Sequence, residues 1–232
     1  MTVRCGIVGG MGPESTLDYY KLMVEHYRNG QDTGYPELTI DIVDLKPILR
    51  FLEVGNRKGL ADYVLDSIDR LVRAGCTFAA LTSNTSHVVF PEVAARSPIP
   101  LISIVEAAAD HATVMGLRRP ALLATSFTVN AGFYQDVFRR RGLTILTPSP
   151  NEQAYLHQKY MDELVHGIVR DDTRAAFVRM ANRLATEEGA DALILGGTEI
   201  PLLLRGAQGI NIPIIDTTLV HVKRLVQMMH SA

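Results

Sequence analysis

The same succession of strand-like segments and loops occurs twice along this chain of 232 residues. Four pairs of positions align in the same order at nearly constant offsets of 113 to 115 residues. The pairs are 6–9 with 121–124, Tyr19 with Tyr134, 74–85 with 188–199, and 99–103 with 212–216. A single match between apolar segments arises easily by chance. Four matches in a shared order predict two halves of similar structure, each with four strands.

Short apolar runs alternate with longer segments of helical length. Strands are predicted at 4–8, 38–43, 78–81, 101–104, 121–124, 143–146, 192–195 and 212–215. Helices are predicted at 15–27, 60–74, 132–141, 151–169, 173–188 and 217–229. Several strands are apolar on both faces, which is typical of parallel sheets covered by helices on both sides. The alternation therefore predicts an α/β protein.

The repeat predicts two α/β domains, each a four-stranded, mostly parallel sheet flanked by helices. We expect residues 1–103 and 212–232 to form the first domain and residues 104–211 the second. No linker rich in proline or glycine separates the halves. The two crossings between them are therefore placed where the repeated units end.

Composition excludes several classes of function. With 23 basic and 25 acidic residues the formal charge is −2, which removes the electrostatic basis for binding nucleic acid or an anionic membrane. No apolar run approaches the roughly 18 residues of a transmembrane helix. The start of the sequence leads directly into a strand-like segment and lacks the features of a secretory signal. We expect a protein of the cytoplasm.

Several conspicuous residues have a plain structural interpretation. Cys5 and Cys76 are too few for a disulfide framework or a cysteine metal site and are interpreted as buried apolar residues. The basic run 139–141 could contact nucleic acid, but it closes a helix, where cations offset the macrodipole. His157 and His166 lie nine residues apart, which does not match helical metal-ligand spacing. We therefore expect no metal.

Four segments follow predicted strands, at the edge of a parallel sheet where ligands bind. They are 9–16, 83–87, 125–128 and 197–199, all rich in small or hydroxylated residues at helix starts. Backbone N–H groups and hydroxyls at such positions suit a carboxylate or phosphate. Because the repeat equates Ser83 with Gly197, these two positions would approach one ligand from opposite sides.

The glycines of the 9–16 loop do not have the spacing of a dinucleotide-binding or P-loop motif. The loop is either a tight turn with Pro13 at the first helical position or a ligand contact, and both can hold. His87 lies four residues after Ser83 and could activate its hydroxyl or simply pack. Glu199, at a helix start, could act in catalysis or in structure. Lys46 and Arg50 could bind a distal carboxylate or lie on a solvated loop.

Four motifs, taken together and in order, resemble the signatures of the aspartate/glutamate racemase family. They are Gly-Gly-Met-Gly-Pro-Glu-Ser-Thr at 9–16, Ser-Asn-Thr-Ser-His at 83–87, Leu-Leu-Ala-Thr at 122–125 and Leu-Gly-Gly-Thr-Glu-Ile at 195–200. The resemblance implies an isomerase, an amino-acid racemase that needs no pyridoxal phosphate or other cofactor. It also implies two pseudosymmetric domains with the ligand cleft between them, a small amino-acid or dicarboxylate substrate, and a homodimer.

The family places one cysteine on each face of the substrate Cα, before Asn-Thr and before Thr-Glu, and these positions are Ser83 and Gly197 here. A serine hydroxyl is not ionised near pH 7 without a base, and glycine carries no proton donor. We therefore expect the two-thiol reaction to be very weak. Two alternatives stay open: a catalytically silent homologue that binds carboxylates, and a relative of the lyase or decarboxylase type with one base.

The candidate site comprises the two catalytic positions, a set of substrate-binding residues, and His87 and Glu199 as auxiliary groups. The substrate-binding residues are Gly10, Met11, Asn84, Thr85, Thr125, Thr128 and Thr198.

Overall fold

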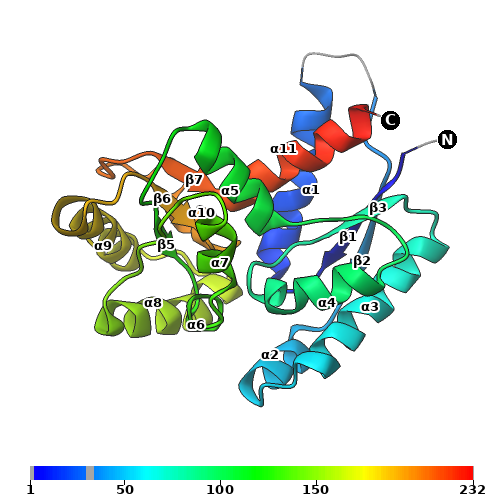
Figure 1. Ribbon diagram of the computed structural model, residues 1–232, viewed down its shortest axis with the longest axis horizontal. Coiled ribbons are helices and arrows are strands. Elements are labelled where there is room, and N and C mark those ends of the chain that lie inside the picture. Colours follow the sequence, from blue (N-terminus) through cyan, green and yellow to red (C-terminus); the bar gives the residue numbers. More distant parts are fainter. Residues whose placement is uncertain (1–2, 30–33, 232) are drawn as a thin grey trace. The chain divides into compact units, whose positions relative to one another are not determined.

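The computed structural model describes residues 3–29 and 34–231 (Figure 1). The chain divides into two compact units. Unit 1 runs to Ile104 and resumes at Thr218, and unit 2 comprises Val105–Thr217. None of the helices within these described ranges has the length and apolar character needed to cross a bilayer.

Unit 1 is built on a parallel sheet of four strands in the order β2-β1-β3-β4. The strands are β1 (Cys5–Gly9), β2 (Leu38–Ile42), β3 (Phe78–Leu81) and β4 (Leu101–Ile102). Its helical segments are α1 (Pro13–Arg28), α2 (Leu45–Glu53), α3 (Arg57–Arg73), η1 (Thr85–Val89), α4 (Phe90–Arg96) and α11 (Thr217–His230), of which α11 joins this unit from Thr218. The predicted four-stranded parallel sheet is therefore confirmed in this unit.

The two inner strands of unit 1, β1 and β3, are buried on both faces. Val8 packs in one cluster with residues of α2, α3 and α4, whereas its neighbour Ile7 packs in another with residues of α1 and α11. Successive strand residues point to opposite faces, so one continuous apolar run supplies two separate clusters. This arrangement accounts for the strands that are apolar on both faces.

Unit 2 has a parallel sheet of three strands in the order β5-β6-β7. The strands are β5 (Ala121–Leu123), β6 (Leu193–Leu195) and β7 (Ile214–Asp216). The helical segments are α5 (Ile104–Val114), α6 (Ser126–Asn130), α7 (Phe133–Arg139), α8 (Pro150–Asp162), η2 (Leu164–His166), α9 (Asp171–Glu188) and α10 (Ile200–Leu204), of which α5 joins this unit from Val105.

The prediction of a fourth strand at 143–146 is wrong in extent. This segment contributes a single parallel bridge, between Leu146 and Ala121, on the free side of β5. Pro148 and Pro150 lie two and four residues after Leu146, and because proline has no N–H to donate, pairing cannot continue beyond Leu146. The bridge nevertheless lies beside β5 as β2 lies beside β1, so the repeated topology is retained.

The boundary between the units differs from the expected one at its second crossing. We expected residues 212–217 in the first domain, but β7 pairs with β6 and belongs to unit 2. The last strand of each sheet is followed by a helix that joins the other unit, α5 from Val105 and α11 from Thr218. The crossings thus fall at equivalent points of the repeat.

The helix predicted at 151–169 is interrupted. α8 ends at Asp162, η2 follows, and Gly167 adopts a φ of 70°, a left-handed conformation that glycine adopts without steric cost. The structure also contains α2, α4, α5, α6 and α10, which the sequence patterns did not predict.

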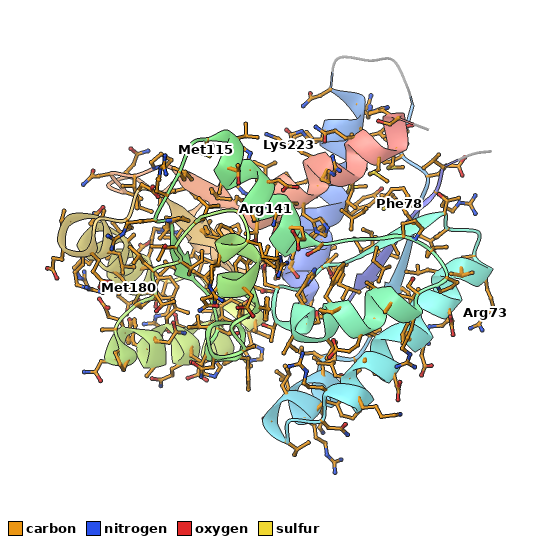
Figure 2. All side chains as sticks on the ribbon, in the orientation of Figure 1. Arg73, Phe78, Met115, Arg141, Met180 and Lys223 are labelled. Carbon is orange, nitrogen blue, oxygen red and sulfur yellow. The ribbon has the colours of Figure 1, made fainter. Side chains whose placement is uncertain are left out.

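The basic run 139–141 serves structure. Arg140 and Arg141 both pair with Glu106 of α5, and Arg141 also reaches Asp110 at 2.8 Å. Figure 2 labels Arg141 near α5 and α7. Arg139 pairs with Asp136 of its own helix at 2.9 Å. All three guanidinium groups are therefore engaged by carboxylates of unit 2, which favours the structural interpretation over a nucleic-acid patch.

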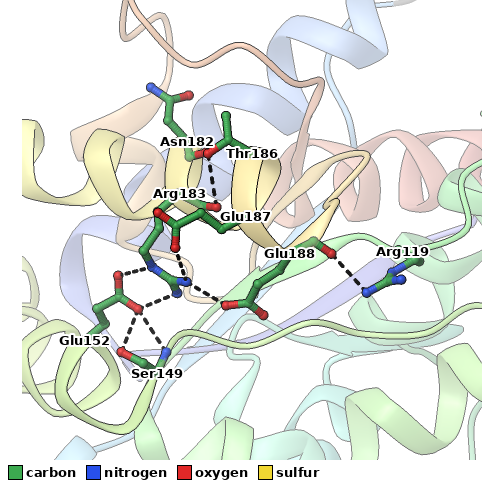
Figure 3. Close-up of polar contacts among 8 residues, drawn as sticks. All are labelled: Arg119, Ser149, Glu152, Asn182, Arg183, Thr186, Glu187 and Glu188. Atoms are coloured by element: carbon green, nitrogen blue, oxygen red, sulfur yellow. Dashed lines mark hydrogen bonds and ion pairs between the residues drawn. The ribbon is translucent and has the colours of Figure 1, made fainter.

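A second ion-pair network attaches α8 to α9 (Figure 3). Arg183 donates to both oxygens of Glu152, with Nε–Oε1 at 2.7 Å and Nη2–Oε2 at 2.6 Å. Glu152 also completes a capping box with Ser149 at the start of α8, and Arg183 reaches Glu188 at 2.7 Å. Bidentate pairs between arginine and a carboxylate fix the relative orientation of the two side chains and also stabilise the contact. The network positions α8.

Candidate functional site

The loop after β1 is a tight turn held by its own side chains. Gly10 has a φ of 85°, and a Cβ there would lie 2.2 Å from the Val43 carbonyl oxygen, so only glycine fits. The Gly10 N–H donates to Thr16 Oγ1 at 3.0 Å, while the Ser15 and Thr16 hydroxyls donate to the Gly12 carbonyl. Pro13 opens α1, as expected.

Met11 connects this loop to the loop after β3. Its side chain is buried, and the Ser86 hydroxyl lies 3.2 Å from the thioether sulfur. The carboxyl ends of β1 and β3 therefore meet, as the motif positions predicted for residues 9–16 and 83–87.

Ser83 follows β3 and is 8% exposed. Its hydroxyl accepts a weak hydrogen bond from the Ser86 N–H at 3.4 Å, and the Ser86 hydroxyl donates back to the Ser83 carbonyl at 3.3 Å. Asn84, also buried, and Thr85 stand at the start of η1. The predicted hydroxyl and amide groups thus lie at the carboxyl end of β3.

His87 is buried and is not placed against the Ser83 hydroxyl. Its Nδ1 lies 2.8 Å from the Ser83 carbonyl oxygen, which can only accept, so Nδ1 carries the proton. Its Nε2 accepts from the Ile104 N–H at 3.3 Å, and the ring stacks on Phe90. Burial lowers the pKa of His87 to about 4. With both nitrogens bound to backbone, this arrangement favours a structural role.

A second buried histidine, which sequence reasoning missed, lies in unit 1. His221 Nε2 lies 2.9 Å from the Ile102 carbonyl oxygen, and its Nδ1 lies 2.7 Å from the Tyr19 hydroxyl. Burial, with a smaller contribution from His87, lowers the pKa of His221 to about 3. These contacts tie α11 to β4 and α1. No local motif marks His221, because its partners are 119 and 202 residues away.

In unit 2, Thr125 and Thr128 lie together after β5. The Thr125 hydroxyl accepts from the Thr128 N–H at 3.3 Å and contacts the Thr128 hydroxyl at 3.2 Å, which caps α6. Gln153 of α8 donates to the Ala124 carbonyl at 2.8 Å. Its buried Oε1 has no hydrogen-bond partner among the described residues. Gln153 was not predicted, since no motif contains it.

The loop after β6 carries Gly197, Thr198 and Glu199. A Cβ at Gly197 would lie 2.5 Å from Cε2 and 3.0 Å from the hydroxyl oxygen of Tyr160. Tyr160 donates a hydrogen bond to Glu199 Oε2, and the Thr198 hydroxyl donates to the same oxygen at 3.0 Å. Burial and then the charge of Glu199 raise the pKa of Tyr160 well above 10. Tyr160, which comes from α8, is another residue that the motifs missed.

The remaining sequence candidates do not belong to the loops that follow β1, β3, β5 and β6. Lys46 and Arg50 are exposed on α2. Cys5 and Cys76 are buried, and burial raises the pKa of both thiols, so neither is a thiolate near neutral pH. Across the described ranges, no group of three or more histidine, cysteine or acidic side chains is arranged to hold a metal ion.

Comparison with known proteins places these loops in a known context. The model of the family Asp/Glu/Hydantoin racemase matches residues 8–225. The chain is 25% identical over 225 residues to the broad specificity amino-acid racemase RacX of Bacillus subtilis (strain 168), with 92% of each chain covered.

Solved structures show the same likeness. A candidate Asp/Glu racemase from Yersinia pestis matches with a TM-score of 0.87 and 27% identity, covering 98% of this chain and 99% of that one. An aspartate racemase homologue from Pyrococcus horikoshii OT3 matches with a TM-score of 0.83 and 31% identity, covering 99% and 100%.

Proposed function

Since the chain belongs to the Asp/Glu/Hydantoin racemase family, we propose that it is a cofactor-independent isomerase of the amino-acid racemase type. It removes and returns the proton on Cα of a small amino acid. One observation carries this proposal. The motif segments stand at the carboxyl ends of β1, β3, β5 and β6, in a chain that matches the family from residue 8 to residue 225.

The groups at these strand ends suit a small amino acid. Hydroxyl, amide and N–H donors of Asn84, Thr85, Thr125, Thr128 and Thr198 are the proposed carboxylate-binding set, with Gly10 and Met11 enclosing one side. The buried acceptor of Gln153 is the kind of group that binds an α-ammonium. This combination favours an amino acid over a simple phosphate.

The proton chemistry must differ from that of two thiols. Position 83 offers a hydroxyl, and His87 beside it is bound to backbone through both ring nitrogens. Position 197 offers no side chain. A general acid or base contributes about 10²–10⁴-fold, so we expect inversion to be slow. The engagement of His87 by backbone favours a second candidate function, a homologue that binds carboxylates without turnover.

The deciding experiment follows the α-proton and the configuration separately. The protein is incubated in D₂O with each L- and D-amino acid, and NMR reports α-proton loss while chiral chromatography reports inversion. Calorimetry with the same ligands reports binding. Exchange of the α-proton faster than in buffer alone supports the proposal that the protein is an enzyme. Binding without exchange identifies the silent homologue, and the absence of both contradicts the proposal.

Three finer expectations belong to the same proposal. An acidic substrate would place its distal carboxylate near Lys46 or Arg50, so Lys46→Ala would weaken aspartate binding more than alanine binding. A homodimer would sediment at twice the 25.5 kDa of the chain. A cytoplasmic location is tested by cell fractionation.

A further inference from the structure

The ring of Tyr160 stands where a side chain at position 197 would begin. A Cβ at Gly197 would meet three Tyr160 atoms within 3.1 Å, and the hydroxyl oxygen is one of them. In the family that this chain resembles, position 197 carries one of the two cysteines. The phenol hydroxyl therefore lies close to the place where that thiol would branch from the backbone.

Tyr160 does not stand there alone. Its hydroxyl donates to Glu199 Oε2, and that oxygen also accepts from Thr198. Tyr160 is 7% exposed, Thr198 is 2% and Glu199 is 1%. A phenol, a carboxylate and a second hydroxyl thus form one connected proton path beside Gly197, inside unit 2.

We propose that Tyr160, coupled to Glu199, is the proton-transfer group for the face of Cα that position 197 serves in this family. The inference rests on the proposed function, because it needs an amino acid bound with Cα near this loop. Tyr160 would supply a proton-transfer group on this face of Cα, where glycine at position 197 has no side chain.

The step balances without any further reactant. The Cα–H bond breaks and its electron pair stays on Cα, delocalised into the substrate carboxylate. A new O–H bond forms at Tyr160 Oη, and the proton that Oη held passes to Glu199 Oε2, which becomes a neutral carboxylic acid. In the reverse direction the acid returns its proton to Oη while Oη protonates Cα.

The hydrogen bond to Glu199 allows the Tyr160 hydroxyl to act as a proton acceptor. The pKa of Tyr160 is raised well above 10, so the isolated phenol stays neutral near pH 7. It can accept a proton only if it passes its own proton to a base in the same step. Glu199 is in hydrogen-bonding contact to take it.

The test gives the other face a known base. Ser83→Cys supplies a thiol at position 83, and three proteins are compared in D₂O: Ser83→Cys alone, with Tyr160→Phe, and with Glu199→Gln. We expect Ser83→Cys to racemise its substrate although position 197 stays glycine. Tyr160→Phe and Glu199→Gln should each lower inversion by about 10²-fold or more, while the enantiomer whose α-proton faces the new thiol still exchanges it.

Two controls separate proton transfer from packing. Tyr155→Phe, on the same helix, removes a hydroxyl elsewhere and should leave both enantiomers' exchange unchanged. Glu199→Asp keeps a carboxylate and should restore part of the inversion lost in Glu199→Gln. A purely structural role for Tyr160 would slow the exchange of both enantiomers equally.

The outcomes distinguish the role of Tyr160 from the proposed function. Inversion that persists in Ser83→Cys/Tyr160→Phe, or an equal loss for both enantiomers, overturns the role of Tyr160. One-sided exchange by Ser83→Cys with Tyr160 intact overturns it as well and leaves the proposed function standing. If neither the native protein nor Ser83→Cys exchanges any amino acid, the proposed function fails, and this inference fails with it.

Discussion

Gly197→Ala tests the claim that Tyr160 occupies the space of a side chain at position 197. The new methyl carbon would lie 2.5 Å from Tyr160 Cε2, against about 3.5–4.0 Å for a favourable carbon–carbon contact. The overlap is therefore at least about 1 Å. Tyr160 is held by Glu199 and by its own burial, so it cannot move away freely.

The cost follows from overpacking a buried site. Inserting a methyl group into a packed core costs about 1–3 kcal/mol, and we expect Gly197→Ala to lower the free energy of unfolding by that amount. Tyr160→Ala removes a large ring and should cost about 3–5 kcal/mol, by analogy with other aromatic truncations. In the double variant the methyl group enters the vacated space, so its penalty disappears.

Urea unfolding of the four proteins measures this coupling as a double-mutant cycle. We expect the double variant to be more stable than the sum of the single effects by about 1–3 kcal/mol. Gly197→Ala combined with Tyr155→Ala is the matched control, and these two effects should add within about 0.5 kcal/mol. Additive effects of Gly197→Ala and Tyr160→Ala would refute the steric argument, and with it the placement of the phenol.

Three further predictions rest on other features of the candidate site. Gly10→Ala should destabilise the protein by more than about 2 kcal/mol in urea unfolding, because its Cβ would meet the Val43 carbonyl at 2.2 Å. Gly55→Ala, also at positive φ but with open space around it, should cost only about 1 kcal/mol. Stability should fall as the pH is lowered from about 6.5 toward 4. Buried His87 and His221, whose pKa values are lowered to about 4 and about 3, stay neutral in the folded protein while the same side chains bind protons in the unfolded chain. The loss attributable to His87 is about 3 kcal/mol, and a pH titration of His87→Gln should be flatter in this window. Finally, Ser83→Cys/Gly197→Cys should invert amino acids faster than the native chain but should require a smaller residue at 160, so adding Tyr160→Ala should raise the rate in a chiral assay.

Two features of the candidate site were legible in the sequence for a local reason. Gly10 lies in a turn between a strand and a helix. Glycines followed by a proline are typical of such a turn, so the sequence predicts it. Ser83 lies two residues after the end of β3, and the carboxyl ends of parallel strands lie at one edge of the sheet. The loops after β1 and β3 could therefore be brought together in advance, and the contact between Met11 and Ser86 agrees with that expectation.

The sequence by itself determined the α/β class, the repeated succession of strands along the chain and the motif positions, because each depends on local periodicity or on a short run of residues. Only the tertiary structure decided that residues 143–146 pair through a single bridge, that His87 binds backbone rather than the Ser83 hydroxyl, and that Tyr160 lies against Gly197. Tyr160 and Glu199 are 39 residues apart, and their contact depends on how α8 packs over the end of β6. Such a contact leaves no periodic signal, since it is set by the three-dimensional packing of a whole unit.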